Sequence, residues 1–259
     1  MKNPLGKVIC AALTLVVIIS GCKKTVPFQG NKLPDYFIDL KVGKYITYRM
    51  DSLNFYYYGQ NDTITSYLAK DSVEKQVVDN TGATAWLVTR YLSDTLGSFW
   101  VPSMTYTVTP SSAAFDVTEN NLRFVKLAFP MDLGYSWTGG TYLPYDPYQD
   151  FFVYSDYNNL TMGAWNYVYT QVNQPFTVAN GVSYDSTATV LLNADSTNVP
   201  VTSPTVFASI TYWSETYAKH IGLVYRRTEM WEYQPPTPDG SQQGYKIGFG
   251  LTLSIVDHN

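Results

Sequence analysis

Alternation of apolar and polar residues with a period of two constrains this chain more than any other feature of its sequence. In KYITYRMDSLNFYYYG, residues 44–59, Ile46 and Tyr48 alternate with Thr47 and Arg49. Successive side chains of a strand point to opposite faces, so this pattern predicts a strand with one buried face. Residue types that favour strands are abundant, with 23 Tyr and 6 Trp, and long helical periodicity is absent. The sequence therefore predicts a mostly β fold.

Turn signals divide the chain into consecutive hairpins. Residues 63–94 contain two predicted strands around DNTG, residues 164–193 contain two around ANG, and residues 205–234 form a third hairpin. Further strands are predicted at residues 98–110, 121–130 and 245–257. Consecutive hairpins predict an antiparallel meander that forms a curved sheet or a partly closed barrel, which would protect the sheet edges. A two-sheet β-sandwich is the alternative.

The first 22 residues have the features of a bacterial lipoprotein signal. Lys2 and Lys7 precede an uncharged run, residues 8–20, and the segment ISGC ends at Cys22. A basic start, a short apolar core and small residues before a cleavage point are typical of a secretory signal. Ser-Gly-Cys resembles a lipobox, which implies lipidation of Cys22; the alternative is an ordinary signal peptide with a chance cysteine. We expect a signal peptide at 1–21, a lipid-anchored tether at 22–40 and a single β domain at 41–259.

Charge and cysteine content exclude several classes of protein. The chain has 17 basic and 21 acidic side chains, and removal of the signal takes away two lysines and no acid. Basic runs are only two residues long, so we expect no nucleic-acid partner. Of the two cysteines, Cys10 lies in the signal and Cys22 would carry lipid, which excludes a cysteine nucleophile. With only two histidines besides, we expect no metal site and no cofactor.

Two segments resemble uncharacterised lipoproteins of the Bacteroidota. Those proteins pair a strand of the form vGxxWxYxxDS near the start with a hairpin of the form YAkgvGlVkre near the end. Here VGKYITYRMDS, residues 42–52, and YAKHIGLVYRR, within residues 214–233, correspond, with Tyr45 in place of Trp and His220 in place of Gly. Residues 95–205 carry no such likeness. The resemblance implies an envelope location and a β fold, and no activity.

His220 is the histidine that a catalytic site would most readily use. Tyr217 and Ala218 end one predicted strand and Leu223 begins the next, so His220 lies in the connection. A GxSxG elbow for a Ser-His-Asp site is absent. We expect a turn residue with positive φ, where glycine is usual, and an acid–base pair with Glu215 is the alternative.

Glu215 and Glu229 are candidate catalytic residues. A glycosidase needs two carboxylates about 5–9 Å apart in a cleft. If the two glutamates face each other across the hairpin, they would lie near Trp213 or Trp231. The alternative is a pair of solvated strand faces.

The segment TYLPYDPYQDFFVYSDYNNLTMGAWNYVYT, residues 141–170, is a candidate ligand-binding surface. A tyrosine-rich loop offers large, rigid contact area, and flat rings beside carboxylates suit glycan binding by stacking and by acceptance of hydroxyl protons. The alternative is a loop that packs its own rings over one end of the sheet. The candidate binding residues are Tyr142, Tyr145, Tyr148, Tyr154, Tyr157, Asp146 and Asp150.

Six Asp-Ser or Asp-Thr motifs followed by a small or apolar residue resemble the O-glycosylation acceptors of Bacteroidota envelope proteins. They exceed their chance frequency, although the same dipeptides are also common turn formers. The candidate acceptors are Ser52, Thr63, Ser72, Thr95, Ser186 and Ser196.

Together these features predict a lipid-anchored envelope protein that acts as a non-enzymatic binding or structural module, with a glycan or an envelope protein as partner. The alternative is a carbohydrate-active hydrolase that uses Glu215 and Glu229. Lys23 and Lys24 follow Cys22, whereas surface-exported lipoproteins of the Bacteroidota tend to carry acids there. We therefore favour the periplasmic face of the outer membrane over the cell surface.

Overall fold

Strands account for most of the described chain. The computed structural model describes residues 33–36, 40–145, 147–152 and 161–259, which belong to one compact unit, Asn31–Asn259; the other unit, Met1–Gly30, lies outside the described residues. The strands are β1 (Tyr45–Tyr56), β2 (Asn61–Val78), β3 (Thr84–Ser93), β4 (Val101–Pro110), β5 (Ala114–Glu119), β6 (Leu122–Ala128), β7 (Ser136–Thr138), β8 (Asn166–Thr177), β9 (Ser183–Thr197), β10 (Ala208–Ala218), β11 (Gly222–Gln234) and β12 (Tyr245–His258). Among the described residues, three short 3-10 helices accompany these strands: η1 (Leu33–Tyr36), η2 (Gln149–Phe151) and η4 (Met162–Ala164).

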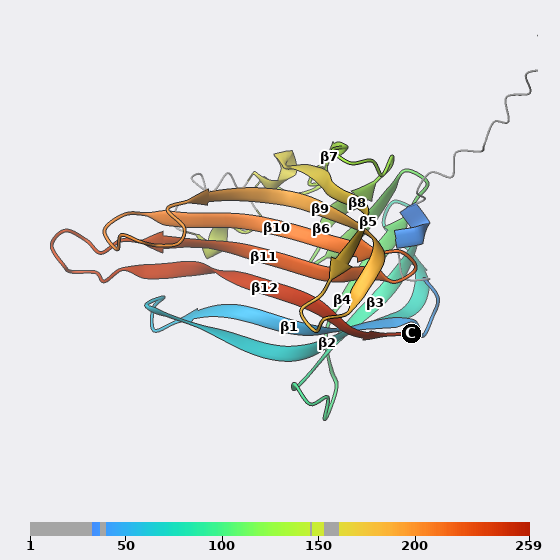
Figure 1. The fold of residues 1–259 in the computed structure, drawn as a ribbon, viewed down its shortest axis with the longest axis horizontal. Coiled ribbons are helices and arrows are strands. Elements are labelled where there is room, and N and C mark those ends of the chain that lie inside the picture. The colour runs from blue at the N-terminus through green and yellow to red at the C-terminus, as the bar shows by residue number, and fades with distance from the viewer. Residues whose placement is uncertain (1–32, 37–39, 146, 153–160) are drawn as a thin grey trace, which may run out of the picture. The chain divides into compact units, whose positions relative to one another are not determined.

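The 12 strands form one antiparallel sheet in the order β6-β5-β4-β3-β2-β1-β12-β11-β10-β9-β8-β7 (Figure 1). Strands that follow each other in sequence are neighbours, and β1 pairs with β12, so the two terminal strands of the domain meet inside the sheet. The predicted antiparallel meander is confirmed. The strands form one curved sheet, and the alternative of a two-sheet β-sandwich is wrong. The short strands β5 and β7 were not predicted.

The sheet is nearly closed into a barrel, because its two edge strands approach each other. The backbone N–H of Val125 on β6 donates to the carbonyl of Gly139, which directly follows β7, at 2.8 Å. The indole N–H of Trp137 on β7 donates to the carbonyl of Val125 at 2.7 Å. These bonds satisfy part of both edges, which otherwise present unpaired backbone groups to solvent. The partly closed barrel expected from the meander is therefore observed.

Strand β11 shows how alternation determines the two faces of the sheet. Val224, Arg226, Thr228 and Met230 are buried, and the residues between them are only partly buried. The buried face joins a core rich in aromatic rings, and each large apolar side chain that is fully buried there contributes about 1.5–3 kcal/mol. The buried rings of this core include Phe124, Tyr167, Tyr169, Trp165 and Trp213.

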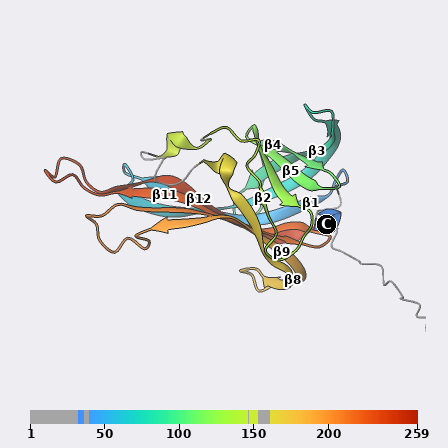
Figure 2. The same cartoon turned by 90° about the horizontal axis from the view of Figure 1, so that it is seen from above.

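Six strands, β9 to β12 with β1 and β2, extend beyond the nearly closed part as a layer (Figures 1 and 2). β2 pairs with β3 only from Leu68 onward, so its first residues pair with β1 alone. β9 pairs with β8 only up to Leu191, and its last residues pair with β10 alone. Hairpin tips at the end of this layer lie opposite η1 in Figure 1.

Candidate functional site

Six largely buried charged side chains, each on a different strand, contact one another inside the sheet. We call them the interior charge network: Asp71 on β2, Arg90 on β3, Glu119 on β5, Lys126 on β6, Glu215 on β10 and Arg226 on β11. Five of these residues are at most 6% exposed, and the side chain of Glu119 is 16% exposed. Three are acidic and three are basic, so the network is balanced in charge, as burial of ions requires.

Glu215 is the centre of one half of the network. Its Oε1 atom lies 2.7 Å from Nζ of Lys126 and 2.9 Å from Nε of Arg226. The indole N–H of Trp213 donates to the same oxygen at 3.0 Å, and the hydroxyl of Tyr217 donates to Oε2. Burial alone would raise the pKa of Glu215, but the charges of Lys126 and Arg226 lower it to about 2. Burial lowers the pKa of Lys126 to about 8, so both groups are charged at neutral pH.

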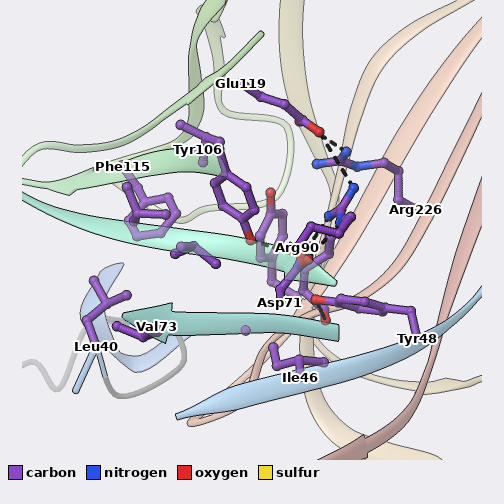
Figure 3. A pocket seen from close by; sticks show the side chains of 16 residues that line it. Leu40, Ile46, Tyr48, Asp71, Val73, Arg90, Tyr106, Phe115, Glu119 and Arg226 are labelled. Carbon is purple, nitrogen blue, oxygen red and sulfur yellow. Dashed lines mark hydrogen bonds and ion pairs between the residues drawn. The ribbon is translucent and has the colours of Figure 1, made fainter. Parts of the chain in front are cut away.

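Arg90 anchors the other half (Figure 3). Its Nε and NH2 atoms donate to the two carboxylate oxygens of Asp71, each at 2.6 Å. Glu119 bridges the halves, with its oxygens 3.6 Å from Arg90 and 3.4 Å from Arg226. Despite burial, these two guanidinium groups hold the pKa of Glu119 below its usual value. The network therefore connects strands on both sides of the gap between β6 and β7.

An inner cavity of about 80 Å³ borders the network. Leu40, Val73 and Phe115 lie at one end, and the guanidinium groups of Arg90 and Arg226 lie at the other (Figure 3). This volume is smaller than the cavity of about 150 Å³ that accepts a benzene ring. The inner cavity is therefore smaller than the space that a benzene ring needs.

A second cavity, of about 240 Å³, shares Glu119 and Arg226 with the first. We call it the aromatic cavity, because four rings line it: Tyr148, Phe151, Trp213 and Phe249. The rings of Tyr148 and Phe151 meet that of Phe249 edge to face, with centroids 5.6 and 5.4 Å away, so the segment around η2 covers β12. The polar residues that line it are Glu119, Asn120, Arg226 and Thr228. Its volume exceeds what a single six-membered ring needs.

Two polar groups in the aromatic cavity are placed by local structure. Asn120 belongs to a two-residue hairpin turn with Asn121, and both have positive φ, 53° and 61°, which asparagine tolerates better than most residues. Thr228 is 2% exposed, and its hydroxyl has no hydrogen-bond partner among the described residues. Buried hydroxyls are nearly always paired with protein, water or ligand. The lining of the cavity therefore contains a buried hydroxyl that has no partner among the described residues.

The tyrosine-rich segment divides between surface and core. Tyr142 and Tyr145 are 56% and 76% exposed, and the guanidinium of Arg123 lies 4.5 Å from the ring centre of Tyr142. Tyr148 is half-buried in the wall of the aromatic cavity. Asp150 is exposed, and three candidates, Asp146, Tyr154 and Tyr157, lie outside the described residues.

The expected pairing of Glu215 with Glu229 is wrong. Glu215 lies opposite Arg226 in the β10–β11 register, and Glu229 lies opposite Tyr212. Tyr212 and Glu215 are three residues apart on one strand, which places the two glutamates on opposite faces of the sheet. Glu229 forms an ion pair of 2.7 Å with Arg227 on the outer face. The two carboxylates therefore do not share a cleft.

His220 is a turn residue, as predicted. It is exposed between β10 and β11 with φ of 64°, and Gly222 follows with φ of 109°. Its backbone N–H donates to the carbonyl of Asp35 in η1. Glu215 is buried inside the sheet, so the alternative of an acid–base pair with His220 is not supported.

The candidate modification sites differ in accessibility. Three acceptors are exposed, Thr63, Thr95 and Ser196, and three are partly buried, Ser52, Ser72 and Ser186. Their glycosylation stays a prediction, and Cys22 lies outside the described residues.

Sequence reasoning missed five of the six members of the interior charge network. A signal for them exists, because each charge occurs in the apolar phase of its strand. Arg226 stands between Val224 and Thr228, and Lys126 follows Phe124 by two residues. A charged residue on the same strand face as buried neighbours needs an oppositely charged partner in the interior of the sheet. The sequence of one strand does not show which residue that partner is.

Comparisons with known proteins give little beyond this geometry. No protein-family model and no curated protein matches the chain. A solved structure of a Bacteroides fragilis protein with a YmcC-like fold is similar at 12% identity and a TM-score of 0.32, over 85% of this chain and 99% of that chain.

No helix in the described part of the chain is long and apolar enough to cross a membrane. The same part holds no cluster of three or more His, Cys, Asp or Glu suited to a metal ion.

Proposed function

We propose that this protein is a lipid-anchored envelope protein that binds a glycan, without catalysis, in the aromatic cavity. The buried, unpaired hydroxyl of Thr228 beside four aromatic rings carries this proposal. A sugar has apolar faces that pack on rings and hydroxyls that exchange hydrogen bonds with polar groups. The cavity supplies both kinds of contact, and its volume of about 240 Å³ suits one sugar ring.

The electrostatics of the site favour binding over proton transfer. A general acid at neutral pH needs a raised pKa. The pKa values of Glu119 and Glu215 are instead lowered by their cationic partners. Glu119 and Arg226 therefore present a fixed acceptor and a fixed donor to the aromatic cavity. Because these charges balance, a neutral sugar matches the site better than a charged one.

The anchor and the location are part of this proposal. The ISGC segment supports lipidation at Cys22, and Lys23 and Lys24 favour the periplasmic face of the outer membrane. Replacement of Cys22 by Ser should abolish incorporation of labelled palmitate and release the protein from membranes. Unchanged membrane partition of the Cys22→Ser protein would contradict lipidation at this residue.

The Thr228→Val variant tests the cavity. Valine keeps the shape of threonine and removes only the hydroxyl, so thermal stability should stay the same or rise slightly. We expect glycan binding to weaken by about tenfold. The full chain, purified in detergent, would be titrated by calorimetry with glucose, galactose, mannose, N-acetylglucosamine and their disaccharides.

Tyr145→Ala is the matched control, because Tyr145 lies on the exposed part of the same aromatic segment. If Tyr145→Ala abolishes binding and Thr228→Val does not, the exposed loop is the binding surface and the cavity is not. If the wild-type protein binds none of these sugars, the cavity proposal fails, and a structural part in an envelope assembly is then the better hypothesis.

A further inference from the structure

The ladder between β1 and β12 opens near the hairpin tips. Pairing of these strands ends at Leu53 and Gly250. Beyond that point β12 contacts the β1–β2 turn, where the N–H of Lys246 donates to the carbonyl of Gly59 at 2.7 Å. The flanking hairpins stay paired up to their own turns, at Tyr56 with Asn61 and at Gln234 with Tyr245. Only the contact between β1 and β12 is therefore interrupted, and the β1–β2 and β11–β12 hairpins on either side stay paired.

An open groove of about 480 Å³ lies at this interruption, and we call it the tip groove. Its side chains are of two kinds, rings and amides. The rings belong to Phe55, Tyr58 and Tyr245, and the amides belong to Gln60, Gln242 and Gln243. None of these three amides has a hydrogen bond to another described side chain. The groove therefore combines flat apolar surfaces with groups that can both donate and accept.

The turn at the tip presents its tyrosines to solvent at a conformational cost. Tyr57 and Tyr58 have φ of 50° and 57°, a region that tyrosine adopts with strain. Their side chains are 70% and 95% exposed, so packing does not repay that strain. An exposed, strained aromatic pair is more typical of recognition than of folding.

The groove is electrically neutral. Lys246 is the charged residue among those that line it, and its Nζ lies 2.9 Å from Oδ2 of Asp62. Nζ of Lys246 also lies 5.0 Å from the ring centre of Trp231, which holds it against the sheet. Nucleic acids and anionic glycans need several free cations, and the groove offers none among its described residues.

We propose that the tip groove binds a neutral linear oligosaccharide. Tyr58 would stack against a sugar ring, and the three glutamine amides would exchange hydrogen bonds with hydroxyl groups of neighbouring residues. The groove is open and larger than the aromatic cavity, so it suits several linked sugars where the cavity suits one. This site stands on different residues from the aromatic cavity and does not depend on what that cavity binds.

Two groove variants, Tyr58→Asn and Gln243→Ala, test the proposal. Asparagine tolerates positive φ, so Tyr58→Asn removes the ring and keeps the turn. The full chain would be titrated with maltohexaose, cellohexaose, mannohexaose and chitohexaose, and with hexagalacturonate as the anionic probe. We expect at least one neutral hexamer to bind, the anionic one not to bind, and each variant to weaken binding by about tenfold.

Phe99→Ala is the control for a lost exposed ring, because Phe99 is 62% exposed and lies outside the groove. It should leave the binding of every hexamer unchanged. Binding of no neutral hexamer tighter than about 1 mM, or equal affinity of Tyr58→Asn and wild type, would overturn the proposal. Stronger binding of hexagalacturonate than of every neutral hexamer would also overturn it.

Discussion

The aromatic cavity and the tip groove use the same chemistry in opposite settings. In the cavity, the rings lie beside Glu119 and Arg226, which also belong to the interior charge network. At the tips, Tyr58 is 95% exposed and touches no core cluster. The binding contacts proposed for the cavity therefore also hold the fold, whereas those proposed for the tips are separate from it. Stability measurements alone should separate the two regions.

Replacement of Glu215 by Gln should give the largest effect. It leaves Lys126 and Arg226 buried beside a neutral amide, and loss of one partner of a buried ion pair costs about 3–5 kcal/mol. Urea unfolding of the variant and the parent would measure the difference. Glu229→Gln is the matched control, because the ion pair of Glu229 with Arg227 is partly exposed and contributes at most about 1 kcal/mol. Equal losses in both variants would mean that the network is not the centre of stability.

Acid should destabilise the protein through the same carboxylate. The folded-state pKa of Glu215 is about 2, below its ordinary value, so the folded protein binds this proton more weakly than the unfolded chain. The resulting stability is present above the ordinary pKa of about 4.5 and is lost as the pH falls from there toward 2. A shift of this size corresponds to a free energy of unfolding on the order of 3 kcal/mol. Unfolding free energies measured between pH 6 and about 3 should fall in the parent and change less in Glu215→Gln.

Tyr148→Ala and Tyr58→Asn compare the two regions directly. Tyr148 packs against Phe249 and Phe151, so its loss should lower stability by about 1–3 kcal/mol. Loss of the exposed ring of Tyr58 should change stability by no more than about 0.5 kcal/mol. Thermal melts of both variants would measure this. A large loss in Tyr58→Asn would show that the tip ring has a structural role, which would remove the difference drawn between the two regions.

The fold was predictable from sequence because alternation and turn chemistry are local. The hairpin around DNTG corresponds to β2 and β3, and the one around ANG corresponds to β8 and β9. The short strand β7 escaped prediction because three residues carry no recognisable period. The curvature that nearly closes the sheet was predicted only as one of two arrangements, since both leave the same pattern in the sequence.

The candidate sites were only partly predictable, because they depend on contacts between distant strands. Lys126 and Glu215 are 89 residues apart in sequence and 2.7 Å apart in the structure. Tyr148 was expected on a binding surface, and the structure places it in a cavity wall completed by Phe249 from the last strand. A single sequence shows that a charged residue needs a partner when its strand position points into the core. It does not show which of the other charges that partner is.

The smallest expected effect concerns the turn at His220, which is a reference for the strained tyrosines at the tips. His220 has φ of 64°, similar to that of Tyr58, and the hydrogen bond to Asp35 uses its backbone N–H, which every residue except proline has. His220→Gly should therefore relieve strain and keep that bond. Glycine also makes the unfolded chain more flexible, which opposes this gain. The free energy of unfolding should therefore stay within about 1 kcal/mol of the parent or rise. His220→Val should lower stability by about 1–2 kcal/mol, because a β-branched residue fits left-handed backbone poorly. Thermal melts of both variants would test this, and neither should change the binding of a sugar to the cavity or the tip groove. A His220→Gly protein that folds as well as the parent and loses binding would place the histidine in a functional site, and left-handed side chains in this fold would then indicate recognition at both ends of the sheet.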